Sequence, residues 1–195
     1  MLTKRPALVH VLLLLALVAG CSQPVHFDGT ALTATTPAPQ VALIDENNRT
    51  FRLTDQHGKP VVLLFGYTHC PDICPTTLAK LARADRLLGS EARDVTVAFV
   101  TVDPQRDTAP VLKRYVHLFD PNFVGLTGSA AALGTLYATY HVWHERLPNH
   151  AGATGYLMAH SSDIYMLDPS GNLRVIHDWN DSAGAMAHDM KALLG

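Results

Sequence analysis

The stretch PVVLLFGY, residues 60–67, constrains the fold most. It is a continuous apolar run of the kind found in a strand that is buried on both faces. A second such run, DVTVAFVTVD, covers residues 94–103, and a helix that starts near Pro75 is predicted between the two. That helix turns three leucines inward: Leu78, Leu81 and Leu88. Buried strands that alternate with helices predict an α/β domain.

The other predicted elements complete a three-layer domain with a central mixed sheet. They are a hairpin of residues 41–44 and 50–53, helices over 108–119 and 129–140, a C-terminal hairpin of 163–168 and 173–178, and a closing helix over 182–194. Three regions are expected along the chain. Residues 1–20 form a leader, residues 21–38 form a flexible tether rich in Thr, Pro and Ala, and residues 39–195 form the domain.

The N-terminus indicates export. Lys4 and Arg5 precede an apolar run, residues 8–19, that is shorter than the about 20 residues of a membrane span. The run ends in small residues before Cys21, which resembles a bacterial lipobox; an ordinary signal peptide or an uncleaved anchor is the alternative. The lipobox reading predicts that Cys21 is lipidated and that the protein is anchored in the bacterial cell envelope, facing the periplasm or extracytoplasmic space.

Charge argues against one class of partner. The formal net charge is −2, and removal of the leader's two basic residues makes it more negative. Lys and Arg do not cluster anywhere in the sequence. We therefore expect no nucleic-acid partner, and membrane contact through the lipid anchor alone.

Two of the three cysteines lie in FGYTHCPDICP, residues 65–75. If Cys21 carries lipid, Cys70 and Cys74 are the thiols left in an oxidising compartment. A disulfide across so short a loop would constrain the unfolded chain little, so a chemical role is favoured over a structural one. The pair follows a central strand and precedes a helix, whose free N–H groups favour thiolates. The spacing permits either a redox disulfide or two ligands of one metal ion.

Two thiolates alone make an incomplete metal site. Soft sulfur selects Cu(I), and imidazole serves copper in either oxidation state. His160 is the candidate third ligand, because its position before the C-terminal hairpin predicts a loop that faces the cysteine loop. His141, His144 and His150 form another group, which is either a second metal site or a solvated loop. Met158 and Met166 are expected in the core.

Three motifs together resemble the Sco (SenC) family of copper metallochaperones. They are GYTHCPDICP, VDPQRDT at residues 102–108, and AHSSDIYMLDPSGNL at residues 159–173. The resemblance implies a thioredoxin-like fold and one copper ion, Cu(I) or Cu(II), bound by Cys70, Cys74 and His160. It also implies a role in assembling the binuclear copper centre of cytochrome c oxidase. Many members have aspartate at the position of Ala159.

The resemblance implies three partners: the oxidase subunit that carries this centre, a copper donor protein and a thiol reductant. Asp103, Arg106 and Asp107 of the second motif are interpreted as a brace for the loop beside the site, with strand-end capping or a surface ion pair as alternatives. Asp72, between the cysteines, either forms the turn or attracts cations.

Three rival functions stay open. A thiol–disulfide oxidoreductase that keeps a target's copper-ligand cysteines reduced is the main alternative, although a Cys-x-x-Cys motif and a proline close to His160 are missing. A peroxidase lacks its Thr or Ser three residues before the cysteine, since Tyr67 and Pro71 stand there. A metal-sensing or adhesion lipoprotein with a structural disulfide is the third. The prediction is a metal carrier, with Cys70 and Cys74 as a redox pair and no assigned catalytic residue.

Overall fold

An eight-stranded mixed sheet forms the centre of the computed structural model, which describes residues 25–148 and 155–195. The strand order is β1-β10-β9-β4-β5-β6-β2-β3. The strands of this sheet are β1 (Thr30–Pro37), β2 (Leu43–Asp45), β3 (Thr50–Phe51), β4 (Val61–Gly66), β5 (Thr96–Thr101), β6 (Val124–Thr127), β9 (Ile164–Leu167) and β10 (Asn172–His177). The helices are α2 (Ile73–Leu88), α3 (Ala109–Val116), α4 (Ala130–Thr139) and α5 (Ala183–Leu194), with 3-10 turns η2 (Leu53–Gln56) and η3 (Gly89–Asp94).

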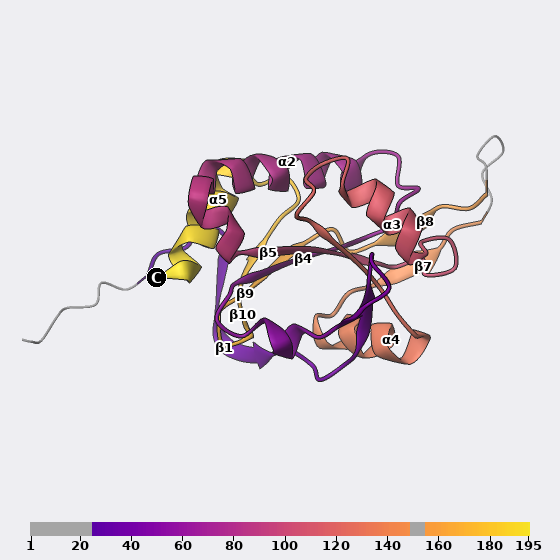
Figure 1. Cartoon of the computed structure of the whole chain (residues 1–195), viewed down its shortest axis with the longest axis horizontal. Coiled ribbons are helices and arrows are strands. Elements are labelled where there is room, and N and C mark those ends of the chain that lie inside the picture. Colours follow the sequence, from indigo (N-terminus) through magenta and orange to yellow (C-terminus); the bar gives the residue numbers. More distant parts are fainter. Residues whose placement is uncertain (1–24, 149–154) are drawn as a thin grey trace, which may run out of the picture.

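Helices cover both faces of the sheet. Figure 1 shows α2, α3 and α5 on one side of the strands and α4 on the other. The two central strands, β4 and β5, run parallel, and every residue of β4 is buried. Their continuous apolar sequences are explained by this double coverage, which confirms the predicted three-layer α/β architecture.

The C-terminal hairpin is confirmed. Strand β9 pairs antiparallel with both β4 and β10, so the hairpin extends the central sheet. At its turn, the Asp168 carboxylate accepts hydrogen bonds from the backbone N–H groups of Ser170 and Asn172. Gly171 has a φ of 80°, a conformation that favours glycine. Helix α5 then packs beside α2 (Figure 1).

Most other predictions agree with the structure to within a few residues. The hairpin of β2 and β3 forms as expected, and helix α2 begins at Ile73 rather than at Pro75. Helix α4 is shorter at its start than predicted because Ser129 is its N-cap, whose hydroxyl accepts a bond from the N–H of Ala132.

The predicted tether is wrong over Thr30–Pro37, which forms edge strand β1 against β10. The run of threonines that suggested a linker also suits a strand, because a β-branched side chain packs well on a pleated surface. The Asp189 carboxylate holds the start of this strand by accepting hydrogen bonds from the N–H groups of Asp28 and Gly29.

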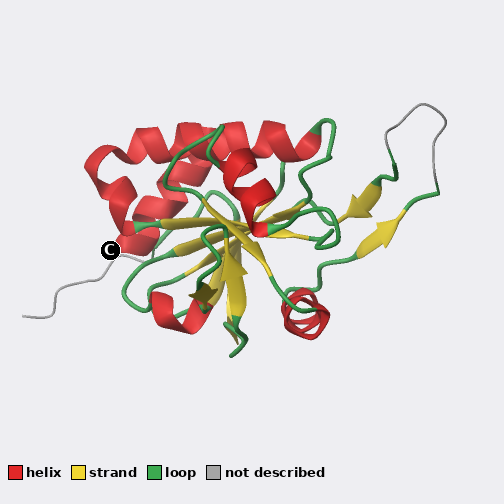
Figure 2. Cartoon of the chain, turned by 45° about the vertical axis from the view of Figure 1, so that its right-hand side comes forward, coloured by secondary structure: helices red, strands yellow, loops and turns green. Residues whose placement is uncertain are grey.

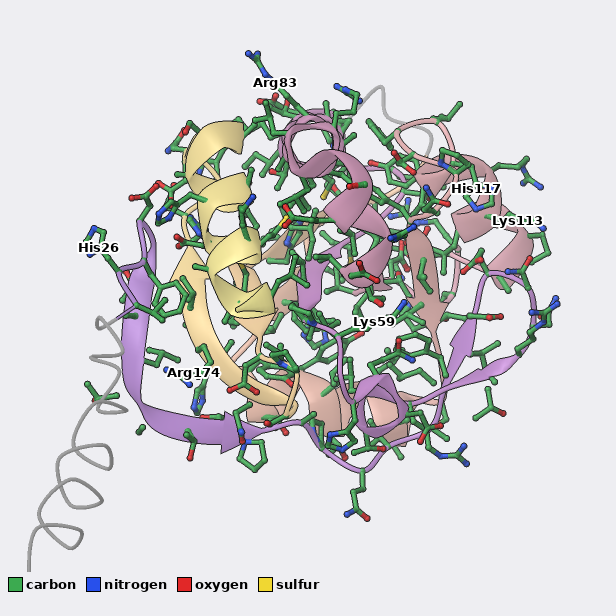
Figure 3. All side chains as sticks on the ribbon, turned by 60° about the vertical axis from the view of Figure 1, so that its left-hand side comes forward. His26, Lys59, Arg83, Lys113, His117 and Arg174 are labelled. Carbon is green, nitrogen blue, oxygen red and sulfur yellow. The ribbon has the colours of Figure 1, made fainter. Side chains whose placement is uncertain are left out.

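The predicted leader and Cys21 lie outside the described residues. Within the described ranges, none of the helices combines the length and apolar character needed to cross a membrane. The labelled basic side chains Arg83, Lys113 and Arg174 lie well apart in Figure 3, on α2, α3 and β10.

Candidate metal site

The cysteine loop connects the end of β4 to the start of α2, as the sequence predicts. Cys70 lies half-buried in the loop, and Cys74 is buried in the first turn of α2. Gly66 allows this arrangement, because a Cβ atom built there would lie 2.7 Å from the Cys74 Sγ and 2.7 Å from the ring of Phe99. The backbone of β4 therefore approaches the buried thiol more closely than any larger residue would permit.

His160 reaches the cysteines from a two-stranded ribbon that the sequence did not predict. Strands β7 (His144–Arg146) and β8 (Met158–His160) pair antiparallel and extend from the main sheet (Figure 2). The expected loop around His160 is thus the end of a strand. Both strands are short and little buried, and their pairing depends on tertiary contacts rather than on an apolar pattern.

The orientation of the His160 ring leaves one nitrogen free for a metal. Its Nδ1 lies 2.7 Å from the carbonyl oxygen of Ser161, which can only accept, so Nδ1 carries the proton. The Nε2 atom then presents its lone pair to the cysteines, 3.5 Å from the Cys74 Sγ. The ring of Tyr67 packs edge-to-face against the imidazole at a centroid distance of 5.8 Å and supports this position.

The structure brings the three predicted ligands together. One donor atom from each of Cys70, Cys74 and His160 lies within 4.8 Å of the others. Metal–thiolate bonds of about 2.3 Å allow one ion to reach both sulfurs and the nitrogen at such separations. Two sulfurs with one imidazole suit a soft ion such as Cu(I) and also permit Cu(II).

The pKa values of the two thiols are shifted in opposite directions. A hydrogen bond from the Cys74 side chain, helped by the N–H of Cys74, lowers the pKa of Cys70 to about 4. The same hydrogen bond and burial raise the pKa of Cys74. The reduced pair without metal is therefore a Cys74 thiol that donates to a Cys70 thiolate. A metal ion that takes both sulfurs must displace this one proton.

A shallow pocket of about 300 Å³ gives access to the site. Cys70 and His160 line it, together with the exposed ring of Trp143 and the partly buried side chain of Met158. Cys74 does not line the pocket, because it is buried in α2. A partner would therefore meet Cys70 and His160 first. Met166 lies fully in the core as predicted, whereas Met158 lies at this pocket.

Asp107 holds the cysteine loop to the neighbouring strand. Its buried carboxylate accepts hydrogen bonds from the N–H of Thr68 at 3.1 Å and from the hydroxyls of Thr68 and Thr101, both at 2.6 Å. Burial raises the pKa of Asp107. The predicted brace beside the site is confirmed for this residue.

Asp103 and Arg106 hold the other half of the site. They form an ion pair, and the hydroxyl of Tyr156 donates to Asp103 at 2.6 Å. Arg106 donates to the carbonyl of Tyr156 at 2.9 Å and stacks on its ring. Because Tyr156 closely precedes β8, this cluster positions the strand that carries His160. The sequence motif predicted a brace but contained no signal for Tyr156, whose partners are distant in the chain.

His141 and His144 do not join the three candidate ligands. His141 is exposed with a φ of 54°, and His144 packs on the ring of Tyr137 at 4.5 Å. Neither belongs to a metal-ligand cluster among the described residues, and His150 lies outside those residues. Asp72 lines the pocket beside Cys70. It is exposed at the N-cap of α2, and its side chain makes no capping hydrogen bond.

A second group of possible ligands, Asp28, His188 and Asp189, was not predicted from the sequence. Both oxygens of Asp189 are already engaged. They accept hydrogen bonds from the two N–H groups at the start of β1. They also accept hydrogen bonds from the ring nitrogens of His177 at 2.9 Å and His188 at 2.8 Å. We interpret this group as a set of ion pairs and hydrogen bonds that holds the start of β1 against α5.

Comparisons with known proteins agree with this geometry. A family model described as SCO1/SenC matches residues 31–195. The chain is 36% identical to a SCO2-like protein of Rickettsia felis over 129 residues, covering 66% of this chain and 63% of that protein. It is 41% identical over 132 residues to the mitochondrial SCO2 homolog of Bos taurus, covering 67% of this chain and 49% of that protein. The matches thus span less than two thirds of these relatives.

Among solved structures, the chain is similar to Bradyrhizobium japonicum ScoI with copper bound. The TM-score is 0.73 at 33% identity, covering 80% of this chain and 98% of that one. The thioredoxin-like fold expected from the sequence is confirmed by this similarity.

Proposed function

The chain belongs to the SCO1/SenC family, and on that premise we propose that it is a membrane-anchored copper metallochaperone that assists assembly of the copper centre of cytochrome c oxidase. It holds one copper ion through Cys70, Cys74 and His160. The observation that carries the proposal is the convergence of two sulfurs and one unprotonated imidazole nitrogen from separate elements. The copper bound in the Bradyrhizobium relative supports the choice of metal.

The site suits a carrier that must both hold and release its ion. Sulfur from both cysteines retains Cu(I), and His160 supplies the additional donor that Cu(II) needs. Cys70 and His160 face the pocket, so a recipient's ligands approach from that side. Oxidation of the two thiolates to a disulfide removes both sulfur donors and passes two electrons to the oxidant, which couples copper release to redox state.

The proposal extends to the setting in the cell. Lipidation at Cys21 would anchor the domain in the bacterial envelope, facing the periplasm or extracytoplasmic space. There it would receive copper from a donor protein, depend on a thiol reductant to keep its cysteines reduced, and deliver the ion to the oxidase subunit that carries the binuclear centre.

Copper stoichiometry after anaerobic reduction tests this proposal. We expect one copper per unaltered chain, and loss of most tight binding in Cys70→Ser and in Cys74→Ser, because one thiolate and an imidazole make a poor Cu(I) site. Cys21→Ser is the matched control: it removes a cysteine that is not a ligand and should keep full stoichiometry. Full copper loading in either site variant would refute the assignment.

Thiol–disulfide exchange is the second candidate function. It is favoured by one observation, the half-exposed Cys70 thiolate whose pKa is lowered to about 4. The two functions separate at His160. A His160→Ala variant that still reduces a disulfide substrate at the unaltered rate but no longer supports oxidase assembly would assign the physiological role to copper, whereas normal assembly in that variant would favour the reductase.

A further inference from the structure

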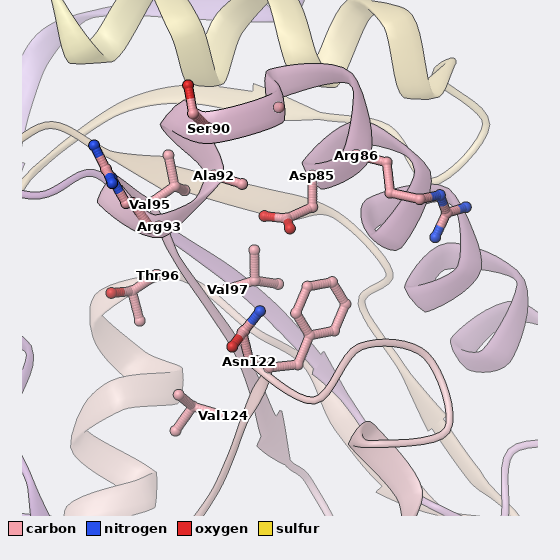
Figure 4. A pocket seen from close by; sticks show the side chains of 12 residues that line it. Asp85, Arg86, Ser90, Ala92, Arg93, Val95, Thr96, Val97, Asn122 and Val124 are labelled. Atoms are coloured by element: carbon pink, nitrogen blue, oxygen red, sulfur yellow. The ribbon is translucent and has the colours of Figure 1, made fainter.

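A cavity of about 720 Å³ opens at the end of the sheet opposite the metal site. The end of α2, the turn η3 and the first residues of β5 and β6 line it (Figure 4). Its lining is mixed: Val97 and Phe123 are buried apolar residues, whereas Arg86 and Arg93 are exposed. It shares no lining residue with the pocket of the metal site.

One acidic side chain, Asp85, is buried at this cavity. Helix α2 buries the leucines at positions 78, 81 and 88 along one face. Asp85 lies on the same face, four residues after Leu81 and three before Leu88, where an apolar residue is expected. Asp85 is only 9% exposed, and Figure 4 shows its carboxylate directed into the cavity. Among the described residues it has neither a hydrogen-bond partner nor an ion-pair partner.

An unpaired buried carboxylate is costly, and aspartate is rarely buried without a partner. Burial raises the pKa of Asp85, and the negative charge of Asp120 adds to this rise. The guanidinium groups of Arg86 and Arg93 form no ion pair with the Asp85 carboxylate. Arg86 points away from the carboxylate in Figure 4, and Arg93 lies 3.7 Å from Asp94 instead.

The composition of the cavity selects the class of ligand. Asp85 is the one buried charged residue of the lining, whereas Arg86 and Arg93 are exposed, so the buried part of the cavity disfavours anions. A metal ion is disfavoured as well, because Asp85 belongs to none of the ligand clusters that the described residues form. An organic cation suits both the buried carboxylate and the apolar residues of the cavity. Its charge pairs with Asp85, and its carbon chain covers Val97 and Phe123.

We propose that this cavity binds a primary ammonium group carried on a short apolar chain, with Asp85 as its counter-ion. A free alkylamine and the lysine side chain of a peptide both present this chemistry. Such a site is independent of copper and of the proposed function, because it lies at the other end of the parallel strands.

The first test compares hexylamine with hexanol on the full, unaltered chain by NMR titration. The two ligands differ only in the head group. We expect the amine to bind at least about tenfold more tightly, and the backbone signals of Val97 and Phe123 to shift. Equal affinity for amine and alcohol, or no binding of either, would overturn the proposal. This comparison does not depend on the folding of any variant.

The second test removes the charge. Asp85→Asn preserves the shape of the side chain and should reduce hexylamine affinity by about tenfold or more while leaving hexanol binding unchanged. Glu91→Gln is the matched control, because Glu91 lies close by on η3 but pairs with Lys191 and does not line the cavity. Retention of amine affinity in Asp85→Asn would contradict the assignment. Capped lysine amide, compared with capped norleucine amide, shows whether a peptide side chain binds as well as the free amine.

Discussion

At the scale of single residues, the metal site depends on an unequal pair of cysteines. Cys70 is the acidic member because Cys74 donates to it from the side chain and from the backbone. The buried partner keeps its proton until a metal displaces it. This asymmetry assigns the first contact with a partner to Cys70, which is also the cysteine that lines the pocket.

We predict that this acidity appears in the alkylation of the reduced, metal-free protein. A lowered pKa means that the thiolate is present above that pKa and is lost as the pH falls through it. The iodoacetamide rate at Cys70 should therefore stay level on acidification and decline only near pH about 4. In Cys74→Ala the midpoint should rise towards the ordinary value of 9.0, because the main hydrogen-bond donor is gone. A midpoint already near that value in the unaltered protein would show that the two thiols are not coupled.

The sequence pointed to the candidate ligands more readily than to the residues that position them. The two cysteines form a local motif, and the motif around His160 suggested the third candidate ligand by resemblance. Tyr156 carries no such signal, because its role follows from contacts with Asp103 and Arg106, which lie far away in the chain. Gly66 likewise stands in an apolar run, and only the packing around Cys74 shows why it is glycine.

At the scale of secondary-structure elements, one short segment after β5 connects both halves of the site. Asp107 holds the cysteine loop through Thr68, while Arg106 holds the approach to β8 through Tyr156. Because Arg106 and Asp107 are adjacent in sequence, the cysteine loop and the strand that carries His160 are held close to each other. The strands β7 and β8 could not be predicted, since their residues are polar or partly exposed and lack an alternating pattern.

We expect Asp107→Ala to weaken both folding and copper binding. The substitution leaves the N–H of Thr68 and the hydroxyls of Thr68 and Thr101 without their acceptor, which should cost about 2 kcal/mol of unfolding free energy. Copper affinity should fall more than in a variant of equal stability, because the cysteine loop loses its attachment. Urea denaturation and competitive copper titration measure the two effects.

Asp55→Ala is the control for that experiment. Asp55 is an exposed aspartate whose ion pair with Arg52 is 3.9 Å long, and surface pairs contribute little. It should leave both measurements unchanged. An Asp107→Ala protein that unfolds at the same urea concentration as the unaltered chain would disprove the bracing role.

At the scale of the whole molecule, the start of the described chain is held at one edge of the sheet, and the candidate metal site lies at the end of a central strand. Edge strand β1 is fixed beside β10, and Asp189 on α5 holds its start. The metal site lies beyond the carboxyl end of β4, as expected for an open α/β sheet. The sequence predicted this arrangement through its buried strands, but not that the chain is already ordered from Thr30.

Membrane attachment should depend on Cys21. In the expression host's envelope, Cys21→Ser should block leader processing or release the domain, because the apolar run before it is too short to replace a lipid reliably. Ser22→Ala leaves the cysteine in place and serves as the control. Membrane fractionation and the mass of the mature N-terminus report both outcomes. Normal processing with full membrane retention in Cys21→Ser would exclude the lipobox.

The most direct test of the central claim is the coordination of copper itself. X-ray absorption of the copper-loaded chain should show two sulfur ligands and one imidazole, and the Cu(II) form should show nitrogen coupling in electron spin resonance. His160→Ala should lose the imidazole signals, weaken Cu(II) more than Cu(I) and still form the Cys70–Cys74 disulfide, whereas His144→Ala should keep the full spectrum. A spectrum unchanged in His160→Ala, or fewer than two sulfurs in the unaltered chain, would contradict the account.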